Sequence, residues 1–299
     1  MPEARHVSIC ICTFARQLWL QRLLETLERQ QTASNFTFSI VVADNDACRS
    51  AEPVVTSFAS RATVAIKYCH EPTRNIALAR NKALNNTDGE FVAFIDDDEF
   101  PADDWLNTLV QACDKYGASG VLGPVRPHFE ETPPSWLIRG RFCERPEHPT
   151  GTIMKWNASR TGNLLFRRPI LNGIPEPFDP AFGTGGEDQD FFMRMNERDF
   201  AFIWCNEAVV YETVPPSRWT RGYMFRRALL RGRNVLKHRG ARTGLLIRSI
   251  VAAPVYSVLV PLTLPFGQHV FMKYSIKLCD HLGRLLALLR LNPVHERQM

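Results

Sequence analysis

The chain has 299 residues, of which 45% are hydrophobic and 22% are charged. This length and composition suit one large or two modest folded domains, and they exclude intrinsic disorder, a collagen-like fibre and a small disulfide-bonded scaffold. The formal net charge of +5 is unevenly divided, because residues 218–299 carry 15 Lys or Arg and two acids, a balance of +13, which leaves −8 on residues 1–217. A basic C-terminal region on an acidic body predicts an anionic partner, either a membrane or a nucleic acid.

The eight cysteines form no Cys-x-x-Cys pair, and none has a histidine at the spacing of a metal site. We interpret them as reduced thiols of a cytosolic protein. We expect no signal peptide, because the apolar stretch near the N-terminus is short and continues into a predicted strand.

Short β-branched runs alternate with amphipathic segments along the first hundred residues. The pattern predicts strands over 7–13, 38–44, 63–69 and 91–95, with a helix around residues 20–27 and another over 76–84. Further along we predict a helix over 103–116, a strand over 119–125 and a proline-rich functional loop over 127–149. The strands are apolar at nearly every position, which is typical of a sheet covered on both faces by helices. The predicted class is α/β with a mainly parallel sheet.

Polar residues collect where the predicted strands end: Thr13, Asp44 and the triplet Asp96-Asp97-Asp98. In parallel sheets, ligands bind beyond the carboxyl ends of the strands, so these residues predict a site. The first strand is not followed by the glycine-rich dinucleotide fingerprint, and the sequence has no phosphate-binding Walker motif. Dinucleotide oxidoreductases and P-loop enzymes are therefore excluded.

The aspartate triplet predicts a cation site. Adjacent carboxylates repel one another, and oxygen ligands of this type suit Mg²⁺ or Mn²⁺ held together with the phosphates of a substrate. The functional interpretation is a clamp for a metal ion and a diphosphate. The alternative is an acidic turn that caps the helix beginning near Pro101.

A second acidic cluster follows two glycines in the segment Gly185-Gly186-Glu187-Asp188-Gln189-Asp190. The glycines allow a ligand to approach the backbone closely, and the acids begin a predicted helix whose N-terminal dipole favours their ionised form. An ionised carboxylate in a crevice can act as a general base toward a hydroxyl group. The alternative is ordinary helix capping.

Five segments in sequence order resemble glycosyltransferase family 2, whose members have the nucleotide-sugar-binding GT-A fold. They are the opening strand with Thr13-Phe14-Ala15-Arg16, the strand end Asp44-Asn45, the stretch from Asn75 to Asn81, Asp96-Asp97-Asp98, and Gly-Gly-Glu187-Asp188. The resemblance covers roughly residues 7–211. Within the family, the chain is most similar to bacterial succinoglycan-type exopolysaccharide glucosyltransferases.

The resemblance implies roles for individual residues. In the donor site, Thr13 and Phe14 would line the nucleotide pocket and Asp44 would hydrogen-bond a uracil ring. The other implied donor-binding residues are Arg16, Asn75, Arg80, Asp96 and Asp97. Asp98 would bind the metal ion. Asp96 would face the ribose and diphosphate and would be a second residue of the metal site. Asp188 would be the catalytic base, and Glu187 would position the acceptor hydroxyl. The resemblance implies a single in-line attack assisted by this base, which inverts the configuration of the anomeric carbon.

We predict three regions along the chain: a nucleotide-sugar-binding half of the GT-A domain over 1–100, an acceptor-binding half over 101–217, and a basic amphipathic helix with membrane-associated helices over 218–299. Residues 218–248 contain ten Lys or Arg and no acid. Their arginines are candidates for contact with phosphate, although for any one of them a solvated basic face is the favoured interpretation. The candidate contacts to an acceptor or its phosphate are Asn163, Arg227 and Arg231.

The 24 uncharged positions between Arg248 and Lys273 are enough to cross a bilayer, but Pro254, Pro261 and Pro265 interrupt them. A single crossing would also export a positively charged tail, against the positive-inside tendency. We therefore predict a re-entrant or interfacial membrane segment, with a buried helical hairpin as the alternative. The arginines lack interleaved aromatic residues for base stacking, so no nucleic-acid partner is expected.

These observations predict an inverting, Mg²⁺- or Mn²⁺-dependent glycosyltransferase. Its donor would be a UDP-linked sugar, and its acceptor would be a saccharide on a lipid carrier. The reaction would belong to cell-surface polysaccharide biosynthesis. It would act at the cytoplasmic face of a bacterial cell membrane, on an anionic surface. Two other functions fit the same residues: a non-catalytic, membrane-associated assembly protein on a transferase fold, and a metal-dependent phosphohydrolase.

Overall fold

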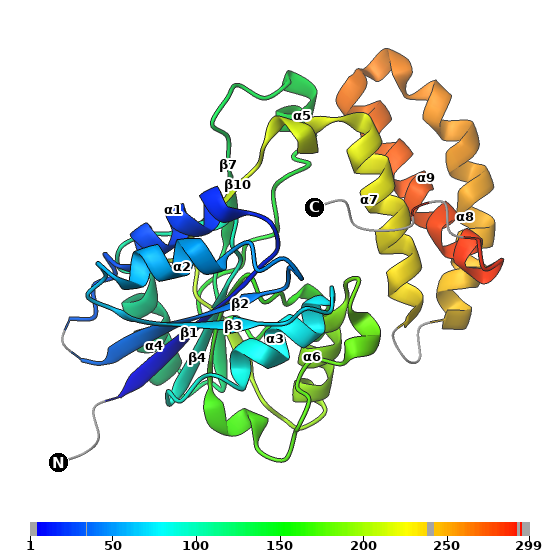
Figure 1. The fold of residues 1–299 in the computed structure, drawn as a ribbon. Coiled ribbons are helices and arrows are strands. Elements are labelled where there is room, and N and C mark those ends of the chain that lie inside the picture. Colours follow the sequence, from blue (N-terminus) through cyan, green and yellow to red (C-terminus); the bar gives the residue numbers. More distant parts are fainter. Residues whose placement is uncertain (1–4, 34, 238–241, 292–293, 295–299) are drawn as a thin grey trace. The chain divides into compact units, whose positions relative to one another are not determined.

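The computed structural model describes residues 5–33, 35–237, 242–291 and 294. The chain divides into two compact units (Figure 1): unit 1 comprises residues 1–126 and 145–212, and unit 2 comprises residues 127–144 and 213–299. The proline-rich segment is therefore split, because its residues 127–144 belong to the C-terminal unit. The expected division of residues 1–217 into donor and acceptor halves stays a prediction.

Unit 1 is built on a seven-stranded sheet with the order β3-β2-β1-β4-β8-β6-β9. Its strands are β1 (His6–Thr13), β2 (Thr37–Asp44), β3 (Ala65–His70), β4 (Phe91–Ile95), β6 (Gly120–Leu122), β8 (Asn163–Arg167) and β9 (Phe202–Trp204). All neighbouring pairs are parallel except those of β8, which runs antiparallel to both β4 and β6. The predicted α/β class with a mainly parallel sheet is confirmed.

Helices cover both faces of this sheet because alternate strand residues point to opposite sides. Ile9 and Ile11 pack with buried residues of α1 (Gln17–Leu27), α2 (Glu52–Ala59) and α4 (Trp105–Lys115). Cys10, between them, packs on the other face with α3 (Ile76–Leu84) and α6 (Glu187–Asn196). Thr13 pairs with Asp44 at the carboxyl ends of β1 and β2, so the strand ends are level. All eight cysteines are free thiols.

A smaller sheet has the order β5-β10-β7, with β5 (Glu99–Pro101), β10 (Val210–Thr213) and β7 (Val125–His128). The strand predicted over 119–125 is thus two strands, β6 and β7, in different sheets. In the antiparallel pair of β5 and β10, Glu99 lies opposite Glu212. This pairing brings a distant acid to the aspartate triplet.

Unit 2 consists mainly of α5 (Ser135–Arg139), α7 (Arg221–Asn234), α8 (Arg242–Leu262) and α9 (Gln268–Leu288). Helix α9 packs against both α7 and α8 (Figure 1). Leu137, Trp219 and Met272 belong to its hydrophobic core. Helices α7 and α9 approach closely at two glycines: a Cβ atom on Gly232 would meet a backbone carbonyl of α9, and one on Gly283 would meet a backbone carbonyl of α7.

Replacing Gly232 with Ala should destabilise unit 2, because the added methyl group forces α7 and α9 apart. We expect the free energy of unfolding to fall by about 1–3 kcal/mol. Gly222→Ala, in the same helix, is the matched control, since a Cβ there meets nothing within 4 Å. It should be neutral or slightly stabilising. Thermal melts followed by circular dichroism measure both, and equal melting temperatures would contradict the close packing of α7 and α9.

Candidate active site

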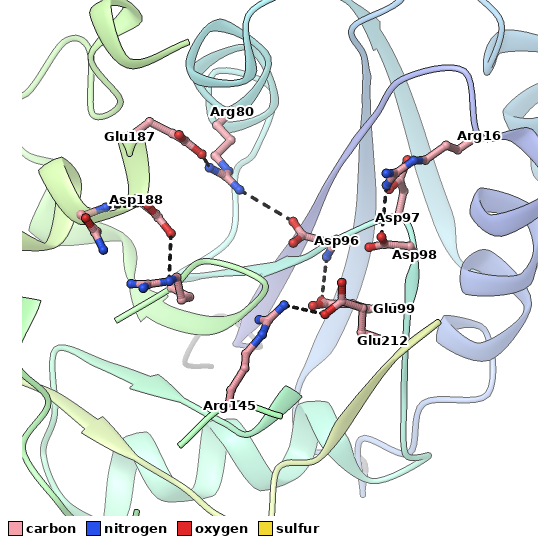
Figure 2. Close-up of polar contacts among 12 residues, drawn as sticks. Arg16, Arg80, Asp96, Asp97, Asp98, Glu99, Arg145, Glu187, Asp188 and Glu212 are labelled. Atoms are coloured by element: carbon pink, nitrogen blue, oxygen red, sulfur yellow. Dashed lines mark hydrogen bonds and ion pairs between the residues drawn. The ribbon is translucent and has the colours of Figure 1, made fainter. Parts of the chain in front are cut away.

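The aspartate triplet directly follows β4, whose five residues are all buried. Its three side chains have different surroundings (Figure 2). Asp97 is buried and accepts hydrogen bonds from Thr13 Oγ1 at 2.8 Å and from Arg16 Nη1 at 2.7 Å. Asp98 is also buried and accepts from Arg16 Nη1 at 3.2 Å. Asp96 keeps 44% of its side chain exposed. The triplet therefore presents one accessible carboxylate beside two that Arg16 holds in place.

Electrostatics in this cluster favour an additional positive charge. Burial is the largest influence on Asp97 and raises its pKa to about 6, although Arg16 lowers it. Partial desolvation also raises the pKa of Asp96; Arg80 lowers it and the nearby carboxylate of Asp98 raises it. The protein thus keeps adjacent carboxylates in a desolvated site, an arrangement that a cation would relieve.

Glu99 extends the cluster and was given no role from the sequence. It is buried, and its Oε2 accepts a hydrogen bond from the backbone N–H of Asp96 at 3.0 Å. Its Oε1 has no hydrogen-bond partner within the described chain. A Cβ atom on Gly162 would lie 2.7 Å from Glu99 Oε1 and 3.0 Å from Asp96 Oδ2. Both carboxylates therefore border a space that only a glycine leaves open.

Arg145 and Glu212 complete this side of the site, and sequence reasoning missed both. Arg145 Nη2 donates to Glu212 Oε2 at 2.6 Å, and Figure 2 shows the pair next to Glu99. Burial lowers the pKa of Arg145, but the surrounding carboxylates, Glu212 first, raise it above its ordinary value. Arg145 therefore stays charged beside the acids.

The second acidic cluster lies at the start of α6. Gly185 and Gly186 have φ values of 119° and 101°, in the left-handed region that favours glycine, and the helix begins immediately afterwards. Asp188 keeps 18% of its side chain exposed, and its Oδ2 lies 3.9 Å from Arg160 Nε. Glu187, in contrast, is buried and ion-paired with Arg80. The resemblance implies that Glu187 positions the acceptor hydroxyl, and this role stays a prediction; in this structure the Glu187 carboxylate pairs with Arg80.

Arg80 connects the two acidic clusters. It comes from α3, its side chain is only 8% exposed, and it pairs with Glu187 through Nη1. Its Nη2 lies 3.7 Å from Asp96 Oδ1. Figure 2 shows the guanidinium between the end of β4 and the start of α6. Arg80 thus links the aspartate triplet to Glu187, the residue that directly precedes Asp188.

Phe14 and Asn75 lie in the part of unit 1 where the resemblance places the nucleotide. The guanidinium carbon of Arg74 lies 4.5 Å from the centre of the Phe14 ring. Asn75 caps α3 by accepting from the N–H groups of the second and third helical residues, and it donates to the carbonyl of Pro180 at 3.0 Å. The nucleotide contacts of both residues stay predictions.

Asp44 is the last residue of β2. Its side chain is fully buried: Oδ1 accepts from the backbone N–H of Asp46 at 3.0 Å, and Oδ2 accepts from the N–H of Ala51 at 2.8 Å and the Tyr68 hydroxyl at 3.1 Å. The hydrogen bond between Asp44 and a uracil ring stays a prediction. In this structure the carboxylate shapes the turn after β2.

Two of the three candidate acceptor contacts have partners within the chain, and their contacts with an acceptor stay predictions. Asn163 is buried in β8, where Nδ2 donates to the carbonyls of Pro124 and Ala208 and Oδ1 accepts from Trp105 Nε1 at 2.8 Å. It therefore joins β8 to α4 and to the segments that contain Pro124 and Ala208. Arg231 in unit 2 forms a bidentate ion pair with Asp280, which ties α7 to α9. Arg227 is exposed on α7, and its contact with phosphate stays a prediction.

The residues present fit a divalent cation that is shared with a substrate. Within the described residues, no three His, Cys, Asp or Glu side chains converge to hold a metal ion by themselves. Mg²⁺ commonly uses one or two carboxylates and completes its shell with phosphates and water. Asp96 offers accessible oxygens, Asp98 lies beside it, and the Oε1 atom of Glu99 is a buried oxygen without a hydrogen bond.

Comparison with known proteins decides the family. The sequence profile of Glycosyl transferase family 2 matches residues 8–172. The chain belongs to this family. It is also 36% identical over 237 residues to the succinoglycan biosynthesis protein ExoM of Rhizobium meliloti, a match covering 78% of this chain and 75% of that protein. The implied likeness to succinoglycan-type enzymes is confirmed.

Two solved structures agree with the fold. A mannosyltransferase from Pyrobaculum calidifontis, in complex with GDP-Man and Mn²⁺, superposes with a TM-score of 0.65 at 17% identity, over 97% of this chain and 89% of that one. S. aureus TarS 1–349, in complex with UDP-GlcNAc, gives a TM-score of 0.56 at 14% identity, over 97% and 93%. The fold is the GT-A fold, and the chain is a glycosyltransferase, which sets aside the phosphohydrolase alternative.

Replacing Arg80 with Met should destabilise unit 1, because it leaves Glu187 buried without this counter-charge. We expect the free energy of unfolding to fall by about 3–5 kcal/mol. The double variant R80M/E187M should recover much of this loss, since it removes both charges. Urea denaturation measures all three proteins, with Arg29→Met as the control because its ion pair with Asp103 is exposed. A loss in R80M no larger than in the control would contradict the role of the pair.

Proposed function

We propose that this family 2 enzyme transfers a sugar, with inversion, from a UDP-linked donor to a hydroxyl group of a saccharide acceptor. The acceptor is carried on a lipid, and the reaction takes place at the cytoplasmic face of the cell membrane in polysaccharide biosynthesis. The observation that carries the proposal is the pair of acidic clusters, one after β4 and one at the start of α6, joined by Arg80. Each cluster serves one end of a displacement reaction.

The donor end is formed by the residues after β4. Asp98 and Asp96 would hold Mg²⁺ or Mn²⁺, which supplies positive charge to the departing diphosphate. Thr13 and Arg16 hold Asp97 and so fix the backbone on which the two metal-site aspartates lie. The GDP-Man and Mn²⁺ in the archaeal mannosyltransferase support a shared site for metal and diphosphate.

The acceptor end is formed by Asp188. As the acceptor oxygen attacks the anomeric carbon, its proton passes to the Asp188 carboxylate, and the bond to the diphosphate breaks with its electron pair on the leaving oxygen. Asp188 lies in the first turn of α6 and keeps 18% of its side chain exposed, so an acceptor hydroxyl can approach its carboxylate. Because the acceptor oxygen attacks the anomeric carbon in line, from the side opposite the departing diphosphate, the configuration inverts.

The choice of donor, acceptor and location depends on further observations. UDP is supported by the family resemblance and by TarS, whose structure contains UDP-GlcNAc. The polysaccharide acceptor is supported by the likeness to the succinoglycan biosynthesis protein. The membrane location is supported by the 15 basic and two acidic residues of 218–299 and by the apolar helix α8. Exposed Arg227 is the candidate contact to an acceptor phosphate.

Asp188→Asn should abolish transfer but not donor binding, because the amide cannot accept the acceptor's proton. We expect kcat to fall by about 10²–10⁴-fold, while the Kd for the nucleotide, measured by calorimetry, stays the same. Glu197→Gln is the control at the other end of α6, where the side chain is exposed. Turnover by the Asp188 variant near the wild-type rate would remove this residue from the role of base.

Asp98→Asn should weaken the binding of the metal ion and, with it, the binding of the donor. We expect kcat/KM to fall by about 10²–10³-fold at fixed Mn²⁺, and the affinity for UDP to lose its dependence on Mn²⁺. Asp103→Asn is the control, because that carboxylate is exposed and pairs only loosely with Arg29, at 3.8 Å. If UDP binds the wild-type protein equally well with and without Mn²⁺, the metal clamp is contradicted.

A further inference from the structure

Helix α8 exposes a continuous apolar surface in unit 2. Its segment Gly244–Leu262 has a mean hydropathy of 1.9 and is long and apolar enough to cross a membrane. The surface continues into the short turn after the helix, and we call it the α8 apolar surface: Ile250, Val251, Val255, Val258, Leu262 and Phe266, all exposed. A contiguous apolar patch of this kind marks an interaction site.

The opposite side of α8 is fixed to α9 by polar contacts. Ser249 is fully buried, and its Oγ lies 3.0 Å from His281 Nδ1. Arg284 Nη1 also donates to Ser249 Oγ, at 3.4 Å. Further along, the ring of Tyr256 stacks on His281, with the ring centroids 5.5 Å apart. Helices α8 and α9 therefore form one hairpin whose inner face is polar.

Helix α9 is in turn fixed to a strongly charged helix. Arg231 of α7 forms its bidentate ion pair with Asp280 of α9, and the close approach at Gly232 and Gly283 locks the two helices together. Helix α7 contains five arginines, and α9 exposes Lys273 and Lys277. If α8 crossed a bilayer with these contacts intact, it would draw the charges of α9 into the hydrocarbon, which is expensive.

Two prolines within α8 also favour a shallow position. Pro254 and Pro261 have no N–H to donate to the carbonyls four residues earlier, at Ile250 and Ser257. In the centre of a bilayer, water is not available to satisfy such carbonyls, whereas at the interface it is. Both prolines lie on the exposed side of the helix.

We propose that unit 2 binds an anionic phospholipid bilayer from one side, with α8 lying in the plane of the membrane and its apolar surface within a single leaflet. The excess of basic over acidic residues in 218–299 supplies the charge that complements anionic headgroups. This inference rests on the proposed membrane location and deepens it, because it assigns the contact surface and excludes a transmembrane crossing.

Vesicle flotation with the full chain tests whether the α8 apolar surface binds the membrane. The wild type should float with vesicles of phosphatidylcholine and phosphatidylglycerol and bind pure phosphatidylcholine at least tenfold more weakly. The double variant V251D/V258D should lose about tenfold or more of its binding to the mixed vesicles, because it places charges on the lipid side. Leu18→Asp is the matched control, since Leu18 is 76% exposed on α1 in unit 1, and it should bind like the wild type. Equal binding by V251D/V258D would overturn the proposal.

Protease protection tests whether α8 crosses the membrane. In sealed inside-out membrane vesicles containing the full chain with a tag at each end, external protease should remove both tags. Protection of the C-terminal tag alone would show that α8 spans the bilayer and would overturn the proposal. A wild type that ignores vesicles but forms dimers, which V251D/V258D abolishes, would instead assign the surface to a second copy of the chain.

The outcome is separable from that of the proposed function. V251D/V258D leaves both acidic clusters of unit 1 unchanged, so its Mn²⁺-dependent affinity for UDP should equal that of the wild type. If the protein binds mixed vesicles as described but transfers no sugar, the membrane inference holds and the proposed function fails. If it transfers sugar but does not bind vesicles, the proposed transfer reaction holds, and both the membrane inference and the proposed membrane location fail.

Discussion

The buried guanidinium of Arg80 is the interaction on which the site depends. A buried carboxylate such as Glu187 is costly unless a cation compensates it, and Arg80 provides that charge from a neighbouring helix. The same guanidinium reaches toward Asp96, the accessible member of the triplet. The start of α6 and the end of β4, which are far apart in sequence, are thereby held in one arrangement. Asp188 follows Glu187 directly, so its position is a consequence of this pair.

Repulsion between carboxylates is the second constraint, and the fold resolves it by giving each one different surroundings. Arg16 compensates Asp97 and Asp98, Arg145 compensates Glu212, and the backbone of Asp96 binds Glu99. Asp96 is left with solvent on one side. A divalent cation brought with a diphosphate would add the positive charge that this arrangement lacks. The chemistry proposed for the site is thus consistent with the way the apo protein is stabilised.

The sequence predicted those parts of the site that depend on parallel strands. Thr13, Asp44 and the triplet follow apolar strands, and the carboxyl ends of parallel strands meet at one edge of a sheet. It could not reveal Glu212, because the antiparallel pairing of β5 with β10 joins distant segments through strands of only three and four residues. Nor could the sequence reveal the internal hydrogen bonds of Asn163 and Asp44, because a polar residue at a strand end can bind the backbone of other segments of the chain.

The central claim is that a single displacement takes place between the metal-site aspartates and Asp188. The configuration of the product tests it most directly. With a nucleotide sugar of α configuration as donor, the anomeric proton of the product should show, by NMR coupling, the β configuration. A product with the α configuration would contradict one-step transfer with Asp188 as base.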